Sequence, residues 1–388
     1  MKKRVNFAQP MFIMLLVITI FAIATVFKAT TAVLMPVTMA VLFSCVFEPP
    51  IIFLNRKFHL PWGLGILLVF IIVGIAIAVL IVLLTSSISA IVKAMPKYEQ
   101  RFTIIYKTLA DWLKIEYNPN LSVFANLWQQ IAVRDQIQNF ALTFSNSVIS
   151  FFKVLGLISL FAIFFLLEMR DLREKIEYAF GHTDKGRVTV MITDIIEQVT
   201  RYLSVKFVLS AATGAIVFIG LSLVGLDFPI VWAFLAFILN FIPTFGSIIS
   251  VLATSLFGVI EFFPHPGPIS IVFILMSFTN FTIGNILEPR IMGRNLGLSP
   301  FVIIVALTFW GWLWGFAGLI IGVPMMVILK IICENVDFLE PAARLLGSYK
   351  PSKEPVQEPQ STTKDTAEDT TKDNTQTNEQ PTTTISTK

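Results

Sequence analysis

Charged residues are scarce in this chain: they make up 14% of its 388 residues, against about a quarter in ordinary soluble domains. It has only two cysteines and three histidines, and neither type shows the spacing of metal ligands or of a disulfide framework. No P-loop motif and no nucleophile–base motif occurs. We therefore expect no enzyme activity, no cofactor and no metal site. The net charge of +4 is small and gives no reason to expect a nucleic-acid partner.

Hydrophobic residues are abundant instead, at 55% of the chain. Several runs of about 20 apolar residues are long enough to cross a bilayer as helices. The sequence therefore predicts an all-α, polytopic helical membrane protein with about eight hydrophobic segments. The uninterrupted predicted spans cover roughly 10–27, 31–54, 62–92, 148–168, 205–225 and 268–287.

The two remaining hydrophobic stretches, 229–262 and 300–333, have 34 residues each and are interrupted near the middle. One continuous helix of that size would be about 51 Å long, whereas a bilayer core of about 30 Å needs only about 20 residues. The interruptions read IPTFG and GWLWGFAG. A break at membrane depth frees backbone polar groups, which the protein or a water-filled cavity must satisfy. Paired breaks of this kind point to the binding site of a transporter.

The polar segments divide the chain into regions. Residues 1–92 form N-terminal spans, and residues 93–147, where apolar residues recur at helical spacing, are expected to be amphipathic and extracytoplasmic. Residues 148–350 form a membrane core that includes a cytoplasmic helical loop at 169–203. Residues 351–388 are rich in threonine and lack aromatic residues, so we expect a disordered cytoplasmic tail.

Lysine and arginine residues set the expected orientation, because they favour the cytoplasmic side. The basic residues at 2–4 place the N-terminus in the cytoplasm, and Arg56 and Lys57 fall on that side after two crossings. Arg290 and Arg294 fall there only if 229–262 dips into the membrane and returns. That re-entrant arrangement is the interpretation we favour, although a single crossing stays open at this stage. Both arrangements put the C-terminus in the cytoplasm, in a bacterial plasma membrane.

The C-terminal half carries ordered motifs. RYLSVKFVLSAATG, NFIPTFG, ILEPRIMGRNLGLSP and FWGWLWGFAGLIIGVPMMVILK follow one another between Arg201 and Val336. This half resembles the autoinducer-2 exporter-like (AI-2E) permease family, which shares an N-x-x-E-P-x-x-x-G…L-S-P run and a later G-x-x-G-x-x-x-x-x-P run. The matching positions are Asn285, Glu288, Pro289, Gly293, Leu298, Ser299, Pro300, Gly315, Gly318 and Pro324. The chain departs from the family after Tyr-Leu, where a glycine and a glutamine are frequent and Ser204, Val205 and Lys206 stand here.

The resemblance implies an inner-membrane permease whose partners are the lipid bilayer and a small-molecule or ion substrate. The expected function is a secondary transporter that exports a small polar solute similar to the autoinducer-2 signal. A sodium(lithium)/proton antiporter is the alternative within transport. A membrane scaffold or assembly protein without transport activity is the alternative from another class. A homo-oligomer is left open.

Polar, aromatic and helix-breaking residues in and beside the broken stretches are the candidates for the translocation site. They are Asn240, Pro243, Gly246, Asn280, Asn285, Glu288, Trp310, Trp312, Trp314, Gly315, Gly318 and Pro324. Asn240 could satisfy carbonyls freed by Pro243 or contact the solute. Glu288 could form an interfacial ion pair with Arg290 or act as a gate or a cation and proton site.

Spacing limits how these candidates can face one another. Asn280 and Asn285 are five residues apart, so on a regular helix they point in different directions. The three tryptophans alternate among glycines and cannot share one face of a regular helix. They fit either packing in an interfacial belt or the lining of a cavity. Gly258 is interpreted as a helix-packing residue.

Overall fold

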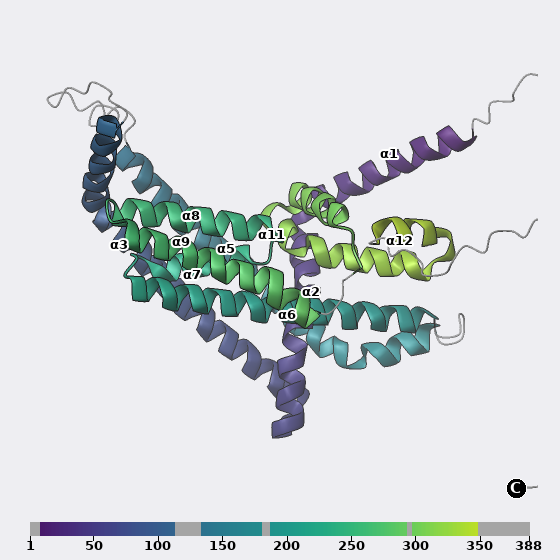
Figure 1. Ribbon diagram of the computed structural model, residues 1–388. Helices are drawn as coiled ribbons and strands as arrows, with labels where there is room; N and C mark the ends of the chain where they lie inside the picture. Colours follow the sequence, from purple (N-terminus) through teal and green to yellow (C-terminus); the bar gives the residue numbers. More distant parts are fainter. Residues whose placement is uncertain (1–7, 113–132, 181–186, 293–296, 348–388) are drawn as a thin grey trace, which may run out of the picture. The chain divides into compact units, whose positions relative to one another are not determined.

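The computed structural model describes residues 8–112, 133–180, 187–292 and 297–347 (Figure 1). The chain divides into two units, 1–349 and 350–388. The second unit, which includes the predicted tail, lies outside the described residues, and so does Gly293. The described part is helical and contains no strand. The long helices are α1 (Ala8–Ala29), α2 (Thr31–Phe58), α3 (Trp62–Trp112), α5 (Val133–Phe180), α6 (Arg187–Val224) and α11 (Pro300–Asn335). The shorter ones are α7 (Pro229–Leu239), α8 (Phe245–Phe262), α9 (Pro266–Phe281), the π-helix η1 (Thr282–Leu287), α10 (Glu288–Met292), the 3₁₀-helix η2 (Asp337–Leu339) and α12 (Glu340–Leu346).

The predicted fold class is confirmed as a polytopic all-α membrane protein. Within the described residues, seven helices are long and apolar enough to span a membrane, and α1 is a further apolar helix. Several helices extend well beyond their predicted spans. α3 is 51 residues long and extends into the region 93–147, which is expected to be amphipathic. The described residues of segment 169–203, which is predicted to be cytoplasmic, belong to the end of α5 and the start of α6.

Apolar side chains cover much of the outer surface. On α3, one stripe with a spacing of three or four residues is half exposed; it comprises Leu67, Ile71, Ile75, Val79 and Val82. A soluble protein would bury such a stripe, but a lipid chain is as apolar as these side chains and solvates them. The interior is formed where α2, α5, α6 and α11 meet, around buried residues such as Ala162, Val199 and Ile321. Both cysteines are buried free thiols.

The first broken stretch is a helical hairpin. α7 and α8 lie side by side with α6 and α9 (Figure 1), and the rings of Trp232 and Phe257, one from each arm, are 4.9 Å apart. Between the arms, Thr244 adopts a positive φ of 61°. A side-chain Cβ added to Gly246 would lie 1.7 Å from the carbonyl oxygen of Leu239. Only glycine therefore permits the arms to approach this closely at the turn.

Local backbone hydrogen bonds satisfy the turn of this hairpin. The N–H of Asn240 donates to the Ala236 carbonyl at 3.0 Å, and the N–H of Gly246 donates to the Ile242 carbonyl at 3.2 Å. Pro243 has no N–H to leave unpaired. The break therefore costs few backbone hydrogen bonds, which is the condition for irregular backbone at membrane depth.

The second broken stretch also folds back on itself, within α11. Helical geometry fails at Trp314 and Gly315, and Gly315 has a φ of 61° and a ψ of −135°. A Cβ on Gly318 would lie 1.7 Å from the Trp310 carbonyl oxygen, so the two arms touch through backbone. Gly315 itself makes no such contact, because no atom lies within 4 Å of its would-be Cβ. Gly315 instead supplies the positive φ of the turn, and Gly318 permits the backbone contact between the two arms.

An ionic cluster joins α3 to both ends of the first hairpin. Lys97 Nζ lies 2.6 Å from Asp227, just before α7, and 2.5 Å from Glu261, at the end of α8. Tyr98 donates a hydrogen bond to Asp227 at 2.7 Å. Burial would raise the pKa of Asp227, but the hydrogen bonds from Lys97 and Tyr98 outweigh it and lower that pKa below its ordinary value. The hairpin therefore begins and ends at the same end of α3.

Alanine at either hairpin glycine tests this geometry. Gly246→Ala and Gly318→Ala each place a methyl group on a backbone oxygen, so we expect each to lower stability by at least about 3 kcal/mol, the upper end of overpacking effects. Thermal unfolding in detergent measures the change. The control is Gly156→Ala on α5, where no atom lies within 4 Å of the new Cβ and the stability should be kept. Equal stability of all three variants would contradict the close contacts.

Candidate functional site

A cavity of about 520 Å³ lies beside the turn of the first hairpin. Its walls come from α6, the hairpin turn, α8, α9, η1 and α10. The polar lining residues are Lys206, Asn240, Thr244, Ser247, Ser277, Asn280, Asn285 and Glu288. Pro243 also lines it, so the structure brings five of the sequence-predicted site residues together in one place.

Asn280 and Asn285 share this cavity because the helix between them is not regular. η1 spans Thr282–Leu287 as a π-helix, in which hydrogen bonds run over five residues rather than four. Residues five apart then lie on the same side. The two amides were expected to point apart only on a regular helix, and η1 departs from that geometry. Asn280 is 6% exposed, and its Nδ2 donates to the Met276 carbonyl at 2.9 Å.

Asn240 connects the hairpin turn to α6. Its side-chain Nδ2 donates to Ser210 Oγ at 3.0 Å, and both residues are buried. Among the described residues, this side chain does not bond the carbonyls freed by Pro243, which was one of the two roles considered from the sequence. Asn240 instead fixes the turn against the neighbouring helix and contributes to the cavity wall.

The cavity contains a buried ion pair between Lys206 on α6 and Glu288 at the start of α10. Lys206 Nζ lies 2.6 Å from Glu288 Oε1, and the two side chains are 3% and 21% exposed. A buried ammonium is costly unless a carboxylate compensates it. The interfacial pair expected between Glu288 and Arg290 is therefore replaced by a pair inside the protein. Sequence analysis did not include Lys206 among the site residues, although a lysine inside an apolar run is itself a signal.

The tryptophans lie outside this cavity. Trp310 and Trp314 are buried, with ring centroids 5.3 Å apart, and Trp314 stacks on Phe27 of α1. Trp312 is half exposed, and Lys28 Nζ lies 4.2 Å from its ring. Of the two roles considered, packing describes them: they seat the turn of the second hairpin against the junction of α1 and α2. Pro324 is likewise buried, in the second arm of α11.

The two hairpins meet through apolar side chains. Leu239 and Ile242 from the first hairpin form one cluster with Leu307 from the second. The sequence candidates for the translocation site come from both broken stretches. The structure places the cavity beside the first hairpin, and the contact between the hairpins is apolar.

The Leu-Ser-Pro motif has a structural position. The N–H of Ser299 donates to the Leu346 carbonyl at 3.0 Å, and Leu298 pairs with Gly347 in an isolated β-bridge. Pro300 begins α11, where a missing N–H costs nothing. Pro289 lies in α10. Leu298 and Ser299 therefore hold the start of the second hairpin against the end of α12. None of these four motif residues lines the cavity.

Comparison with known proteins agrees with this architecture. The sequence profile described as AI-2E family transporter matches residues 11–337. The chain belongs to the AI-2E transporter family. An AI-2E transporter is a multi-pass membrane protein that moves a small substrate through a lipid bilayer, and the polar cavity lies within such a membrane domain.

Three relatives illustrate the range of names in the family. A Borreliella burgdorferi protein whose name assigns transport provisionally is 32% identical over 87% of this chain and 91% of its own length. The AI-2 transport protein TqsA of Escherichia coli is 28% identical over 81% of this chain and 89% of its own. A protein of Halobacillus andaensis named as a sodium-lithium/proton antiporter is 24% identical over 81% and 92%.

Removing one member of the buried pair should cost more than removing both. Glu288→Gln leaves the Lys206 ammonium buried and unpaired, so we expect a loss of about 3 kcal/mol in stability. The double variant Lys206→Met/Glu288→Gln should recover most of it. The control Glu334→Gln breaks a more exposed pair with Lys330 and should cost less than about 1 kcal/mol. Thermal unfolding in detergent measures all three, and a double variant no more stable than Glu288→Gln would contradict the pairing.

Proposed function

We propose that this AI-2E transporter is a secondary transporter that exports a small polar solute similar to autoinducer-2, and that the cavity beside the first hairpin binds it. This proposal rests on the cavity. Its volume of about 520 Å³ falls in the range of small-ligand sites. Three asparagine amides and the Lys206–Glu288 pair supply donors and acceptors for a solute rich in hydroxyl and carbonyl groups.

The first hairpin is the proposed moving element. Its turn has a non-helical residue, Thr244. Within the described residues, one side-chain hydrogen bond, from Asn240 to Ser210, connects the turn to α6. The Lys206–Glu288 pair closes the cavity between α6 and α10. A solute that takes hydrogen bonds from these groups competes with both contacts. Solute binding would then favour movement of the turn, as alternating access requires.

A sodium(lithium)/proton antiporter is the second candidate, and Glu288 is the observation that favours it. A small cation could bind this carboxylate in place of the Lys206 ammonium. Exchange of one cation for another would then take place at a single carboxylate, as an antiporter requires. The name of the Halobacillus relative agrees with this chemistry.

The proposed orientation places both termini in the cytoplasm and both hairpins as re-entrant segments of the plasma membrane. Two observations support it. Lys97 contacts residues at both ends of the first hairpin, so these ends share one side. Arg290 then lies on the cytoplasmic side, as the distribution of basic residues favours.

Flux through reconstituted vesicles tests the function. We expect autoinducer-2 efflux per folded protein to fall about tenfold in Asn280→Ala, the effect of losing about 1.4 kcal/mol of hydrogen bonding. Asn335→Ala is the matched control, because Asn335 Nδ2 also donates to a carbonyl four residues earlier, at 2.9 Å, but lies on α11 away from the cavity. Sodium-dependent proton movement without solute efflux would identify the antiporter. If neither flux is observed, the scaffold alternative is the one that remains.

Thiol labelling tests the orientation. In a Cys45→Ala/Cys333→Ala background, Ile291→Cys, at an exposed position of α10, should resist an impermeant thiol reagent added to intact cells. His265→Cys, in the exposed turn between α8 and α9, should react readily. The re-entrant arrangement is wrong if the reagent labels both positions equally from outside.

A further inference from the structure

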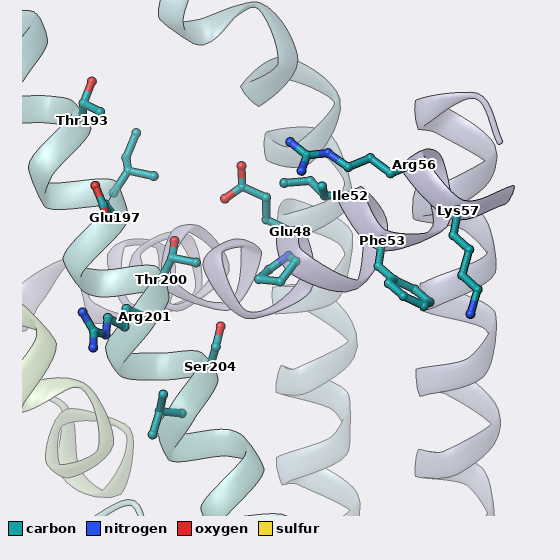
Figure 2. A pocket seen from close by; sticks show the side chains of 13 residues that line it. Glu48, Ile52, Phe53, Arg56, Lys57, Thr193, Glu197, Thr200, Arg201 and Ser204 are labelled. Atoms are coloured by element: carbon teal, nitrogen blue, oxygen red, sulfur yellow. The ribbon is translucent and has the colours of Figure 1, made fainter. Parts of the chain in front are cut away.

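A second cavity, of about 900 Å³, lies between the end of α2 and the first half of α6. Figure 2 shows Glu48 and Arg56 on α2 facing Glu197 and Thr200 on α6. Its walls combine apolar side chains, among them Ile52, Phe53, Ile196 and Val205, with five charged residues, Glu48, Arg56, Lys57, Glu197 and Arg201. This composition suits neither a fully polar solute nor a purely apolar one.

The charged residues of this cavity lack partners. Among the described residues, Glu48, Arg56, Glu197 and Arg201 form no ion pair. Glu197 and Arg201 are four residues apart on α6, where a helical ion pair is expected, yet they do not form one. Lys57 instead lies over the ring of Phe53, 5.1 Å from its centroid. Two carboxylates and at least two cations therefore face one cavity uncompensated.

Two hydroxyl groups on the same wall are also unsatisfied. The Oγ1 of Thr200 and the Oγ of Ser204 are buried and have no hydrogen-bond partner among the described residues. Both residues line the cavity. A buried hydroxyl usually has a partner, so a ligand with acceptor oxygens would complete this wall.

The cavity also continues into the lipid-facing surface. Phe53 is half exposed, and Pro49 is exposed beside it. Arg56 and Lys57 stand in the last turn of α2, where basic residues mark the cytoplasmic boundary of a span. The apolar part therefore lies at the depth of acyl chains and the charged part at the depth of headgroups.

We propose that this groove binds the headgroup of a zwitterionic phospholipid with a primary amine, phosphatidylethanolamine, from the cytoplasmic leaflet. The ammonium group lies between Glu48 and Glu197, and an arginine of the groove neutralises the phosphate. The hydroxyls of Thr200 and Ser204 donate to phosphate or ester oxygens. An anionic headgroup would meet two carboxylates without bringing a cation. A quaternary choline has no N–H to donate to them.

The test measures lipid binding to the full chain in detergent by native mass spectrometry. Phosphatidylethanolamine, phosphatidylcholine and phosphatidylglycerol with identical acyl chains are titrated separately. We expect at least fivefold tighter binding of phosphatidylethanolamine than of either other lipid. Glu48→Gln/Glu197→Gln should abolish this preference, whereas Arg56→Gln should weaken the binding of all three lipids. Glu174→Gln and Arg170→Gln, at exposed positions of α5, should change neither property.

Three outcomes would overturn the proposal. The first is equal binding of the three lipids, and the second is preferential binding of phosphatidylglycerol. The third is competition by free phosphoethanolamine at the concentration of the lipid, because that result would identify a soluble zwitterion as the ligand. Each variant is first matched to the wild type in gel-filtration profile and melting temperature. Where Arg56→Gln fails that match, Arg56→Lys replaces it and should retain the preference with weaker binding. The assay needs no transport, so it is independent of the proposed solute.

Discussion

The contact between Gly246 and the Leu239 carbonyl sets most of the features of the transport domain. In hydrocarbon a chain can reverse only where its backbone groups find partners within the protein. At this turn the arms meet backbone to backbone, with no room for a Cβ. The turn therefore lies deep between α6 and α9, and polar side chains from three segments gather around it. The same close backbone contact recurs at Gly318 against Trp310, where the buried rings of Trp310 and Trp314 belong to the hydrophobic core.

The buried pair explains why this cavity can be polar. Lys206 alone would destabilise the fold, and so would Glu288 alone. Together they allow two charged groups to remain inside a membrane domain, where they are available to a ligand. A charge pair is weak support for stability because desolvation offsets much of its attraction. Its presence between α6 and α10 therefore supports the proposed role in binding.

The sequence predicts those features that depend on composition and local breaks. Runs of apolar residues predict the helices, and Pro243, Gly246, Gly315 and Gly318 mark both turns. It does not predict which side chains meet across the fold. Asn280 and Asn285 face one cavity only because a π-helix replaces a regular one, and no residue type marks that change. Lys206 meets Glu288 across 82 positions of sequence, and the helical spacing of neither residue indicates the other.

α6 connects the two cavities. Lys206 faces the proposed solute cavity, whereas Ser204 and Val205, two residues and one residue earlier, line the groove against α2. Successive residues on a helix point about 100° apart, so one turn of α6 presents different faces to the two sites. A ligand that fixes this turn against α2 also fixes the position of the Lys206 ammonium. In the proposed mechanism, the solute cavity opens by displacement of Glu288 and the first hairpin, while α6 stays in place. The proposed lipid groove and the proposed moving hairpin lie on different faces of one helix, an arrangement that would separate a static wall of the transporter from a mobile one.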